Sequence, residues 1–379
     1  MVSRPERLLR HREDPVSASF LELFFDLAFV FTLNQVAVVL LADLSVGGAL
    51  RTTLLLAAVW FLWVTTTWSA DWYAPDAPVV RVVLVGSALG GLLMGAAVPS
   101  ALEGRAALFV GAYLAVNAVR GLLGLFVLRG HPLRRRIARI LCWFAVSGVF
   151  WLAGLFLPAA RVPLWALAVI VEYAGPAAGW PTLRLGRARP GELRLRGAHF
   201  AERFQQVFII SLGELILSAG LAYAQSGTSV AQTSAFLLIF ATAVLLGLLY
   251  VTPGGRQLAS AIERAEPARL GAASNLLHLV MIAGVVSTAV GAELAIGHPG
   301  EPGAVAVVAA GPALFLAGRL LLAAAIDRRF SLPRLLGLPA LAVVGLVAAD
   351  LPLLVATAVT TAVLVAVAAV DRSRVFAPG

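Results

Sequence analysis

The 379-residue chain is hydrophobic throughout, because 60% of its residues are apolar and 13% are charged, and its mean hydropathy is +0.91. A soluble globular protein contains about 45–50% apolar residues, so the composition excludes a soluble domain and indicates an integral membrane protein. The 29 basic side chains are all arginine and give a net charge of +9. We ascribe this charge to membrane topology, and we expect the lipid bilayer and no nucleic acid as partner.

Apolar segments long enough to cross a bilayer follow one another along the chain. A transmembrane helix needs about 20 apolar residues, and twelve segments meet this requirement. They are predicted at residues 20–44, 49–72, 79–99, 105–128, 137–158, 161–181, 200–224, 231–252, 270–295, 303–325, 333–349 and 351–370. The fold class is therefore all-α, a polytopic membrane helical bundle of about 12 transmembrane helices.

The arginines favour one orientation of these helices. With the N-terminus inside, 23 arginines fall on the cytoplasmic side and three fall outside. Three more, Arg120, Arg203 and Arg319, lie within predicted spans. The positive-inside rule then predicts cytoplasmic N- and C-termini. The basic clusters at 134–136 and 184–196 would also suit contact with anionic lipid, although the topological role is favoured.

The two halves of the chain show a weak similarity. A shift of 180 residues aligns Glu22 and Asp26 with Glu202 and Gln206, and a shift of 199 aligns Arg120 with Arg319. This predicts a 6+6 parallel internal repeat, and the alternative is a chance match of a few polar residues. The predicted parts are an N-terminal tail (1–19), a first six-helix bundle (20–181), a basic cytoplasmic linker (182–199), a second six-helix bundle (200–370) and a C-terminal tail (371–379).

Polar side chains within the spans are the candidates for function. An ionisable group inside the hydrocarbon costs about 2.5–3.5 kcal/mol unless it finds a partner or water. Glu214 is the leading residue because it lies roughly 20 Å deeper than Glu202 at 1.5 Å per residue. It would take up and release protons or cations, and the alternative is a structural ion pair with Arg120 or Arg319. The predicted substrate or ion path comprises Glu22, Asp26, Asn34, Gln35, Arg120, His199, Glu202, Arg203, Gln206, Glu214, His278 and Arg319.

Other features have simpler interpretations. Glu172 followed by Gly175 and Pro176 indicates either a broken helix or a packing kink, of which the kink is favoured. Trp63 would line a cavity or pack against neighbouring helices, and packing is favoured. His199 and Glu202 are spaced for one side of a metal site, but a single pair is a weak signal, so we expect no metal and no cofactor.

Two glycine pairs in the third segment, Gly86/Gly90 and Gly91/Gly95, have the spacing that allows helix backbones to approach closely. They need only a packing role.

Four segments resemble the bacterial low temperature requirement A family. They are ELFFDLAFVFTLNQ at 22–35, WFLWVTTTWSADWYAPDAPVVR at 60–81, HFAERFQQVFIISLGE at 199–214 and NLLHLVMIAGVVSTAVG at 275–291. The resemblance implies a multi-pass protein of the bacterial cytoplasmic (inner) membrane, with cold adaptation in the family's name and no established reaction. The motif residues that carry over are Phe24, Phe25, Asp26, Gln35, Arg81, His199, Glu202, Arg203, Phe204, Gly213, Glu214 and His278.

Three classes of function remain open at this point. The first is a secondary transporter or an ion or proton channel that moves a small solute or ion past the intramembrane carboxylates. The second is an intramembrane enzyme acting on lipid or a lipid-linked substrate, with His199, Glu202 and Asp26 as acid and base near the cytoplasmic interface. The third is a structural or lipid-sensing membrane protein. The sequence contains no nucleophile, metal or nucleotide motif, which favours transport.

Overall fold

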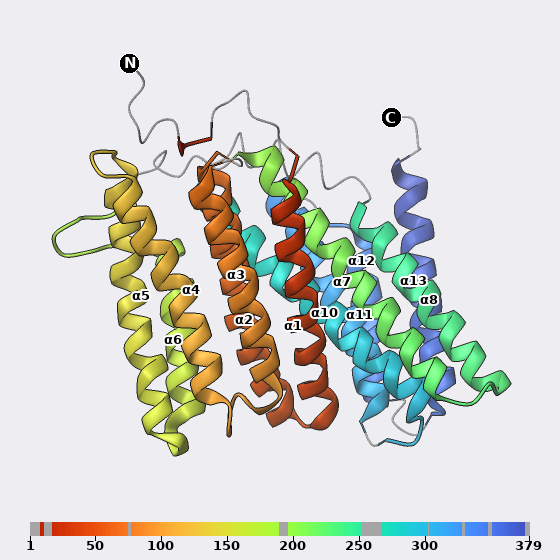
Figure 1. Cartoon of the computed structure of the whole chain (residues 1–379). Helices are drawn as coiled ribbons and strands as arrows, with labels where there is room; N and C mark the ends of the chain where they lie inside the picture. The colour runs from red at the N-terminus through yellow and green to blue at the C-terminus, as the bar shows by residue number, and fades with distance from the viewer. Residues whose placement is uncertain are drawn as a thin grey trace. The chain divides into compact units, whose positions relative to one another are not determined.

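The computed structural model describes residues 8–10, 17–74, 77–188, 196–251, 267–301, 303–327, 330–347 and 351–375. Parts of the two predicted tails, of the basic linker and of the arginine-containing loop at 253–269 lie outside the described residues. Apart from two isolated β-bridges, the regular structure that is described is helical, which confirms the all-α fold class (Figure 1). The helices are α1 (Phe20–Ala42), α2 (Val46–Trp72), α3 (Pro78–Ala97), α4 (Ala106–Val127), α5 (Leu133–Phe156), α6 (Arg161–Ala178), α7 (Gly197–Gln225), α8 (Val230–Val251), α10 (Pro267–Gly297), α11 (Ala304–Asp327), α12 (Leu332–Val347) and α13 (Leu353–Val375).

Each of the twelve predicted segments corresponds to one of these helices. Ten helices within the described part of the chain are long and apolar enough to cross a membrane. The other two are α6, which contains Arg161 and Glu172, and α12, which is 16 residues long. Large apolar side chains such as Leu27, Ile170 and Leu346 are exposed on the helices, as a hydrocarbon environment requires. The chain is therefore a multi-pass helical membrane protein.

Helix α6 is not broken at Pro176. It continues through the proline to Ala178 and ends at Gly179, which has a left-handed backbone with φ of 70°. Trp180 also has a positive φ, of 47°, and its backbone N–H donates to the carbonyl of Gly175 at 2.9 Å. Because Pro176 lies in the last turn, the helix ends shortly after it, and the alternative of an unwound segment at this position is wrong.

The described residues form two compact units. Unit 1 lies within 1–35, 53–203 and 259–272, and unit 2 within 36–52, 204–258 and 273–379. The residue assignment divides α1, α2, α7 and α10 between the units. The predicted domain boundaries and the internal repeat stay predictions.

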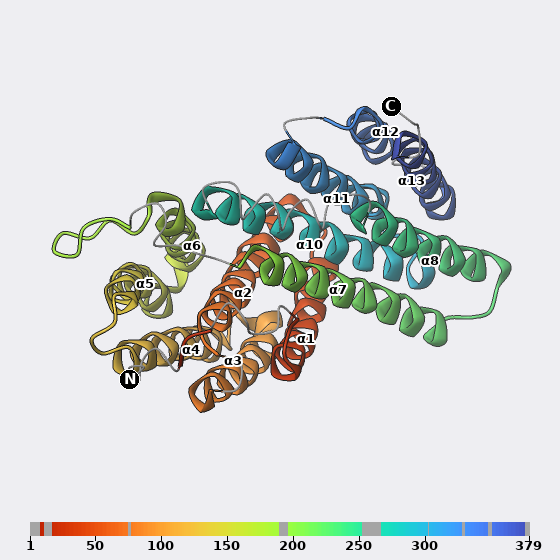
Figure 2. The ribbon, with the colours of Figure 1, turned by 90° about the horizontal axis from the view of Figure 1, so that it is seen from above.

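In unit 1, α3 packs against α4, α4 against α5 and α5 against α6. Figure 2 shows these four helices in succession along one side of unit 1. Residues 8–10 are joined to the end of α2, because Leu9 and Tyr73 form a β-bridge and the N–H of Arg10 donates to the carbonyl of Trp72 at 3.1 Å. An apolar cluster that includes Tyr73, Leu128 and Ile137 underlies this junction.

In unit 2, α8 packs against α13, and α11 against both α12 and α13. The hydroxyls of Thr242 on α8 and Thr361 on α13 are 3.0 Å apart. Helices α10 and α11 approach closely at two glycines, since a Cβ added to Gly284 would lie 2.7 Å from the carbonyl oxygen of Gly311. Near the end of α13, the carboxylate of Asp371 accepts from Ser331 and Arg334.

The two glycine pairs of α3 contact their neighbours unequally. A Cβ at Gly95 would lie 2.6 Å from Oγ1 of Thr32 on α1, and a Cβ at Gly90 would lie 2.1 Å from a methyl group of Val116 on α4. A Cβ at Gly86 or Gly91 would meet nothing within 4 Å. The hydroxyl of Thr32 also donates to the carbonyl of Gly91 at 3.0 Å, so α1 and α3 are in direct contact at this point.

We predict opposite effects for the same substitution at two neighbouring positions of α3. Gly95→Ala would force Thr32 away and lower the free energy of unfolding by about 1–3 kcal/mol, as overpacking does. Gly91→Ala has room and would raise it by about 0.5–1 kcal/mol, because alanine loses less backbone entropy than glycine in a helix. Thermal unfolding of the purified protein in detergent measures both. Equal midpoints for the two variants would contradict the α1–α3 contact.

Candidate functional site

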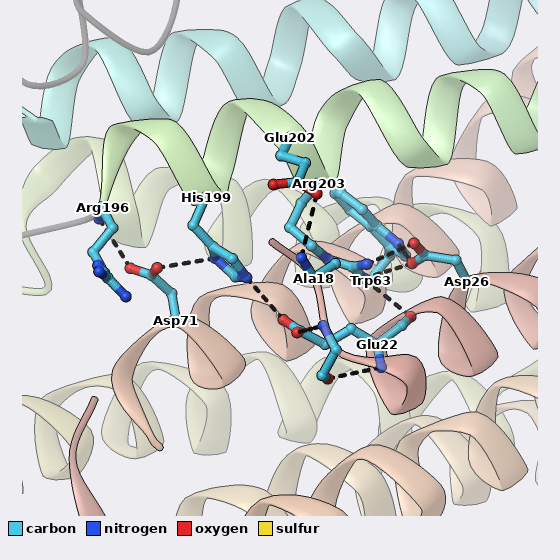
Figure 3. A network of polar contacts seen from close by, with 10 residues as sticks. Ala18, Glu22, Asp26, Trp63, Asp71, Arg196, His199, Glu202 and Arg203 are labelled. Atoms are coloured by element: carbon cyan, nitrogen blue, oxygen red, sulfur yellow. Dashed lines mark hydrogen bonds and ion pairs between the residues drawn. The ribbon is translucent and has the colours of Figure 1, made fainter. Parts of the chain in front are cut away.

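A network of buried charged side chains lies in unit 1, where α1 and α7 begin and α2 ends (Figure 3). Each helix contributes residues that its periodicity places on one face. Glu22 and Asp26 are four residues apart on α1, and His199 and Arg203 are four apart on α7. The fifth member, Asp71, comes from the last turn of α2. All five side chains are at most 3% exposed.

Asp26 and Arg203 form the strongest contact of the network. The two terminal nitrogens of Arg203 each donate to one carboxylate oxygen of Asp26, both at 2.7 Å. Such a two-pronged guanidinium–carboxylate pair is charge-assisted and fixes the relative orientation of its partners. The indole N–H of Trp63 donates to the same carboxylate at 2.8 Å, and the guanidinium lies 5.9 Å from the centre of that indole ring. Asp26 is thus held from α2 and α7 together.

His199 lies between two carboxylates. Its Nε2 is 3.1 Å from Oε1 of Glu22, and its Nδ1 is 3.1 Å from Oδ1 of Asp71. The second oxygen of Asp71 accepts from the backbone N–H of Arg196 at 3.1 Å. We refer to Glu22, His199 and Asp71 as the acid–histidine chain. Figure 3 shows it running from α1 through the imidazole of α7 to α2.

Glu22 has a second role at the start of α1. Its Oε2 accepts from the backbone N–H of Ser19 at 2.7 Å, and its own N–H lies 3.4 Å from the Ser19 hydroxyl. This reciprocal pair is a capping box, which satisfies backbone donors at a helix start. The adjacent N–H of Ala18 donates to Glu202 at 3.3 Å. The cap orients Glu22 so that its other oxygen faces His199.

The charges of the network do not cancel. Glu22, Asp26 and Asp71 are three carboxylates, whereas Arg203 provides one fixed positive charge. The five side chains therefore sum to −2 with a neutral imidazole and to −1 with a protonated one. Histidine is the side chain best suited to gain and lose a proton near neutral pH. The arrangement can bind a proton at a place closed to bulk water.

The structure brings together five of the predicted site residues, namely Glu22, Asp26, His199, Glu202 and Arg203. The other predicted residues of unit 1 lie elsewhere. Asn34 and Gln35 are neighbours in the chain whose side chains bond to each other at 3.2 Å. Arg120 on α4 donates to the hydroxyl of Thr66 at 2.8 Å and to the side chain of Asn117.

The remaining predicted residues belong to unit 2. Gln206 is half-buried on α7, and Glu214 accepts from Ser218, one turn further along α7, at 2.9 Å. His278 on α10 has its Nδ1 2.7 Å from the carbonyl of Ser274 and its Nε2 3.1 Å from the hydroxyl of Tyr250. Its ring stacks on Phe204 with centroids 3.8 Å apart. Arg319 on α11 donates to the carbonyl of Leu249 at 3.3 Å.

Glu172 forms a separate buried cluster in unit 1. Its carboxylate accepts from Tyr113 at 2.6 Å, Ser147 at 2.9 Å and Trp151 at 3.0 Å. These donors come from α4 and α5, so the carboxylate joins three helices. Among the residues that the structure describes, no group of three or more histidine, cysteine or acidic side chains has the arrangement of a metal site.

One member of the network, Asp71, and its neighbour Trp63 were not among the predicted site residues. Asp71 follows a run of aromatic residues near a helix end, and Trp63 was interpreted as a packing residue. In the structure Trp63 does pack, with its ring stacked on Trp60 at 4.8 Å, but it also donates to Asp26. The spacing Ser19-x-x-Glu22 was a readable sign of a helix start, with Ser19 as the N-cap and Glu22 in the first turn. No comparable local pattern identifies Asp71 as the partner of His199.

Comparison with known proteins shows similarity to a family and to a bacterial relative. Residues 17–369 match the family described as Bacterial low temperature requirement A protein. An uncharacterized protein of Rhizobium meliloti (strain 1021) is 34% identical over 321 residues, which cover 83% of this chain and 78% of that protein. The family match at residues 17–369 includes α1, α2 and α7, the helices that form the network.

We predict that the Asp26–Arg203 pair is required for stability. Arg203→Gln leaves a buried carboxylate without its counter-charge and would lower the free energy of unfolding by about 3–5 kcal/mol. Adding Asp26→Asn to this variant would recover part of the loss, because the unpaired charge is removed. Thermal unfolding in detergent measures the midpoints of the unmodified protein, the single variant and the double variant.

The matched control for this cycle is the pair between Arg51 and Asp43, which is largely exposed. Arg51→Gln would shift the unfolding midpoint far less, since exposed ion pairs contribute little. Similar midpoint shifts for Arg203→Gln and Arg51→Gln would show that the buried pair does not stabilise the fold.

Proposed function

The chain belongs to the bacterial low temperature requirement A family, and from the acid–histidine chain we propose that it is a proton-coupled secondary transporter of the cytoplasmic (inner) membrane. The observation that carries this proposal is the position of His199, with a carboxylate 3.1 Å from each ring nitrogen. Ionisable residues buried in membrane helices commonly mark proton relays and ion paths. Multi-pass helical folds are the usual framework for such transport.

The chemistry of a proton step follows from the geometry. A proton that arrives on Glu22 passes to Nε2 of His199, and the imidazolium then releases the proton on Nδ1 to Asp71. One proton enters the ring and one leaves it, so the charge of the ring is restored. The reverse sequence moves a proton the other way. Ser19 and the N–H of Arg196 hold the two carboxylates in place at either end.

The charge of Arg203 supports this role. Its guanidinium is paired with Asp26 at 2.7 Å, so within the five side chains one negative charge is matched and those of Glu22 and Asp71 remain. A proton on His199 is then the means by which the excess negative charge is reduced. The positive-inside rule places this end of unit 1, with its arginines at 134–136 and 184–187, at the cytoplasmic side. Under this topology the acid–histidine chain exchanges protons with the cytoplasm.

We predict that replacing His199 stops proton movement. Purified protein would be reconstituted into liposomes containing a pH-sensitive dye, and a pH gradient imposed with and without a panel of organic solutes. His199→Gln would lower the initial proton flux at least tenfold, because glutamine donates hydrogen bonds but does not carry a proton between two carboxylates. Glu22→Gln would lower it as well. His298→Gln, at an exposed position beyond α10, is the matched control and would retain the flux of the unmodified protein.

The same experiment separates the alternatives. Proton flux that persists in a folded His199→Gln variant would remove the acid–histidine chain from the path. Loss of flux in Glu214→Gln but not in His199→Gln would favour the residue that the sequence placed first. Absence of flux in the unmodified protein, with any solute tested and with a monodisperse preparation, would count against transport and favour the lipid-directed enzyme or the structural role.

A further inference from the structure

A cavity in unit 1 is lined by polar and aromatic side chains that have no role in the proposed proton transport. It has a volume of about 720 Å³ including its mouth, and residues of α2, α4, α5 and α6, together with Tyr73 and Trp180 just beyond two helix ends, line it. Four of its wall residues are tryptophans, Trp68, Trp72, Trp143 and Trp180, half of the eight in the chain. We call it the tryptophan cavity.

The polar groups of the tryptophan cavity are rich in donors. The guanidinium of Arg120 has two partners, the oxygens of Thr66 and Asn117, and both are neutral. The indole nitrogens of Trp68 and Trp72 are buried and have no hydrogen-bond acceptor among the described residues. A buried donor without an acceptor is costly, and a buried charge normally has a counter-charge. These groups together call for an anionic acceptor.

The one carboxylate in the lining is already satisfied. Glu172 accepts three hydrogen bonds, from Tyr113, Ser147 and Trp151. Among the described residues, it accepts no hydrogen bond from Arg120 or from the two indoles. A second guanidinium, that of Arg136, lies 4.2 Å from the centre of the Trp72 ring and adds positive potential at the same wall. The balance of free donors over free acceptors favours a negative ligand over a cationic one.

The backbone around Trp180 is shaped to hold its ring in the wall. Its positive φ of 47° is uncommon for a bulky residue and marks a conformation that the surroundings impose. Gly175 makes room for the ring, since a Cβ there would lie 2.8 Å from the indole nitrogen. Trp180 meets Trp68 edge to face, with centroids 6.2 Å apart. The indoles give a flat apolar surface beside Arg120.

We propose that the tryptophan cavity binds a small organic anion, with its carboxylate on Arg120 and the indole N–H groups and its apolar body against the tryptophan rings. Guanidinium groups bind carboxylates with two parallel hydrogen bonds, and aromatic walls suit a planar or compact apolar body. This inference does not rest on proton transport, because ligand binding is measured at equilibrium without flux.

The test uses benzoate as the probe and the full chain in detergent. Tryptophan fluorescence reports binding directly, because four indoles line the cavity. We expect saturable binding of benzoate, with benzylammonium, benzyl alcohol and inorganic phosphate at least about tenfold weaker, the factor that one charge-assisted hydrogen bond provides. Equal binding of benzyl alcohol would overturn the role of the charge. Equal binding of phosphate would overturn the role of the aromatic walls.

Variants of Arg120 locate the site. Arg120→Gln would weaken benzoate binding at least tenfold, and Arg120→Lys severalfold, since lysine keeps the charge but not the planar fork. Arg105→Gln is the matched control, because Arg105 is an exposed arginine that donates to the carbonyl of Ala96 outside the cavity. If Arg120→Gln does not fold, benzoate binding to Arg120→Lys alone tests the site. Unchanged binding in Arg120→Lys and in a folded Arg120→Gln would refute the proposal.

A second variant tests the wall. Gly175→Ala places a methyl group against the Trp180 indole, which would have to move, and we expect benzoate binding to weaken severalfold. Gly213→Ala, where an added Cβ meets nothing within 4 Å, is its control. Equal affinities for benzoate in the two glycine variants would show that Trp180 does not contribute to the site.

Discussion

The need to pair every charge inside a low-dielectric environment governs unit 1. Removing a carboxylate or a guanidinium from water costs several kcal/mol, and the cost is offset only when geometry and hydrogen bonds are good. Asp26 meets this condition by accepting three hydrogen bonds, two from Arg203 and one from Trp63. Because the donors come from α7 and α2, a single carboxylate on α1 determines where all three helices meet. The acid–histidine chain then lies one turn nearer the helix ends.

The buried titratable groups in the described residues have different surroundings, and these differences separate structural from functional roles. Glu172 is surrounded by neutral donors, and His278 contacts a carbonyl, a hydroxyl and an aromatic ring. Both arrangements are satisfied without a change of charge. His199 instead has charged groups at both nitrogens, so its own protonation alters both contacts. The surroundings of His199 suit the proton-binding role that we propose for it, whereas those of Glu172 and His278 suit a role in fixing helix positions.

Composition and hydropathy were sufficient for the fold and for four of the five charged residues of the network. Hydropathy predicted the twelve helices, and the cost of burying charge singled out Glu22, Asp26, His199 and Arg203 as candidates. Spacing along one helix does not say which neighbouring helix faces it. Asp71 therefore looked like part of an interfacial aromatic segment, and Trp63 like packing alone. At Pro176 the sequence left a broken helix as the alternative to the favoured kink, and this alternative is wrong because the proline lies in the last turn of α6. Contacts between helices depend on side-chain fit that single-sequence patterns do not contain.

Helix α2 connects the two sites that we propose. At about 100° per residue, Asp71 lies about 80° from Trp63, and Trp68 and Trp72 lie about 140° and 180° from it. Around the helix Asp71 therefore lies between Trp63 and the two tryptophans that line the cavity. A proton released from His199 to Asp71 would neutralise that carboxylate, weaken its contact with the imidazole and free the end of α2, next to Trp72. An anion bound at Trp68 and Trp72 would hold that end in place. Any coupling between proton and anion in unit 1 would then pass through the last two turns of α2, because both sites contact them.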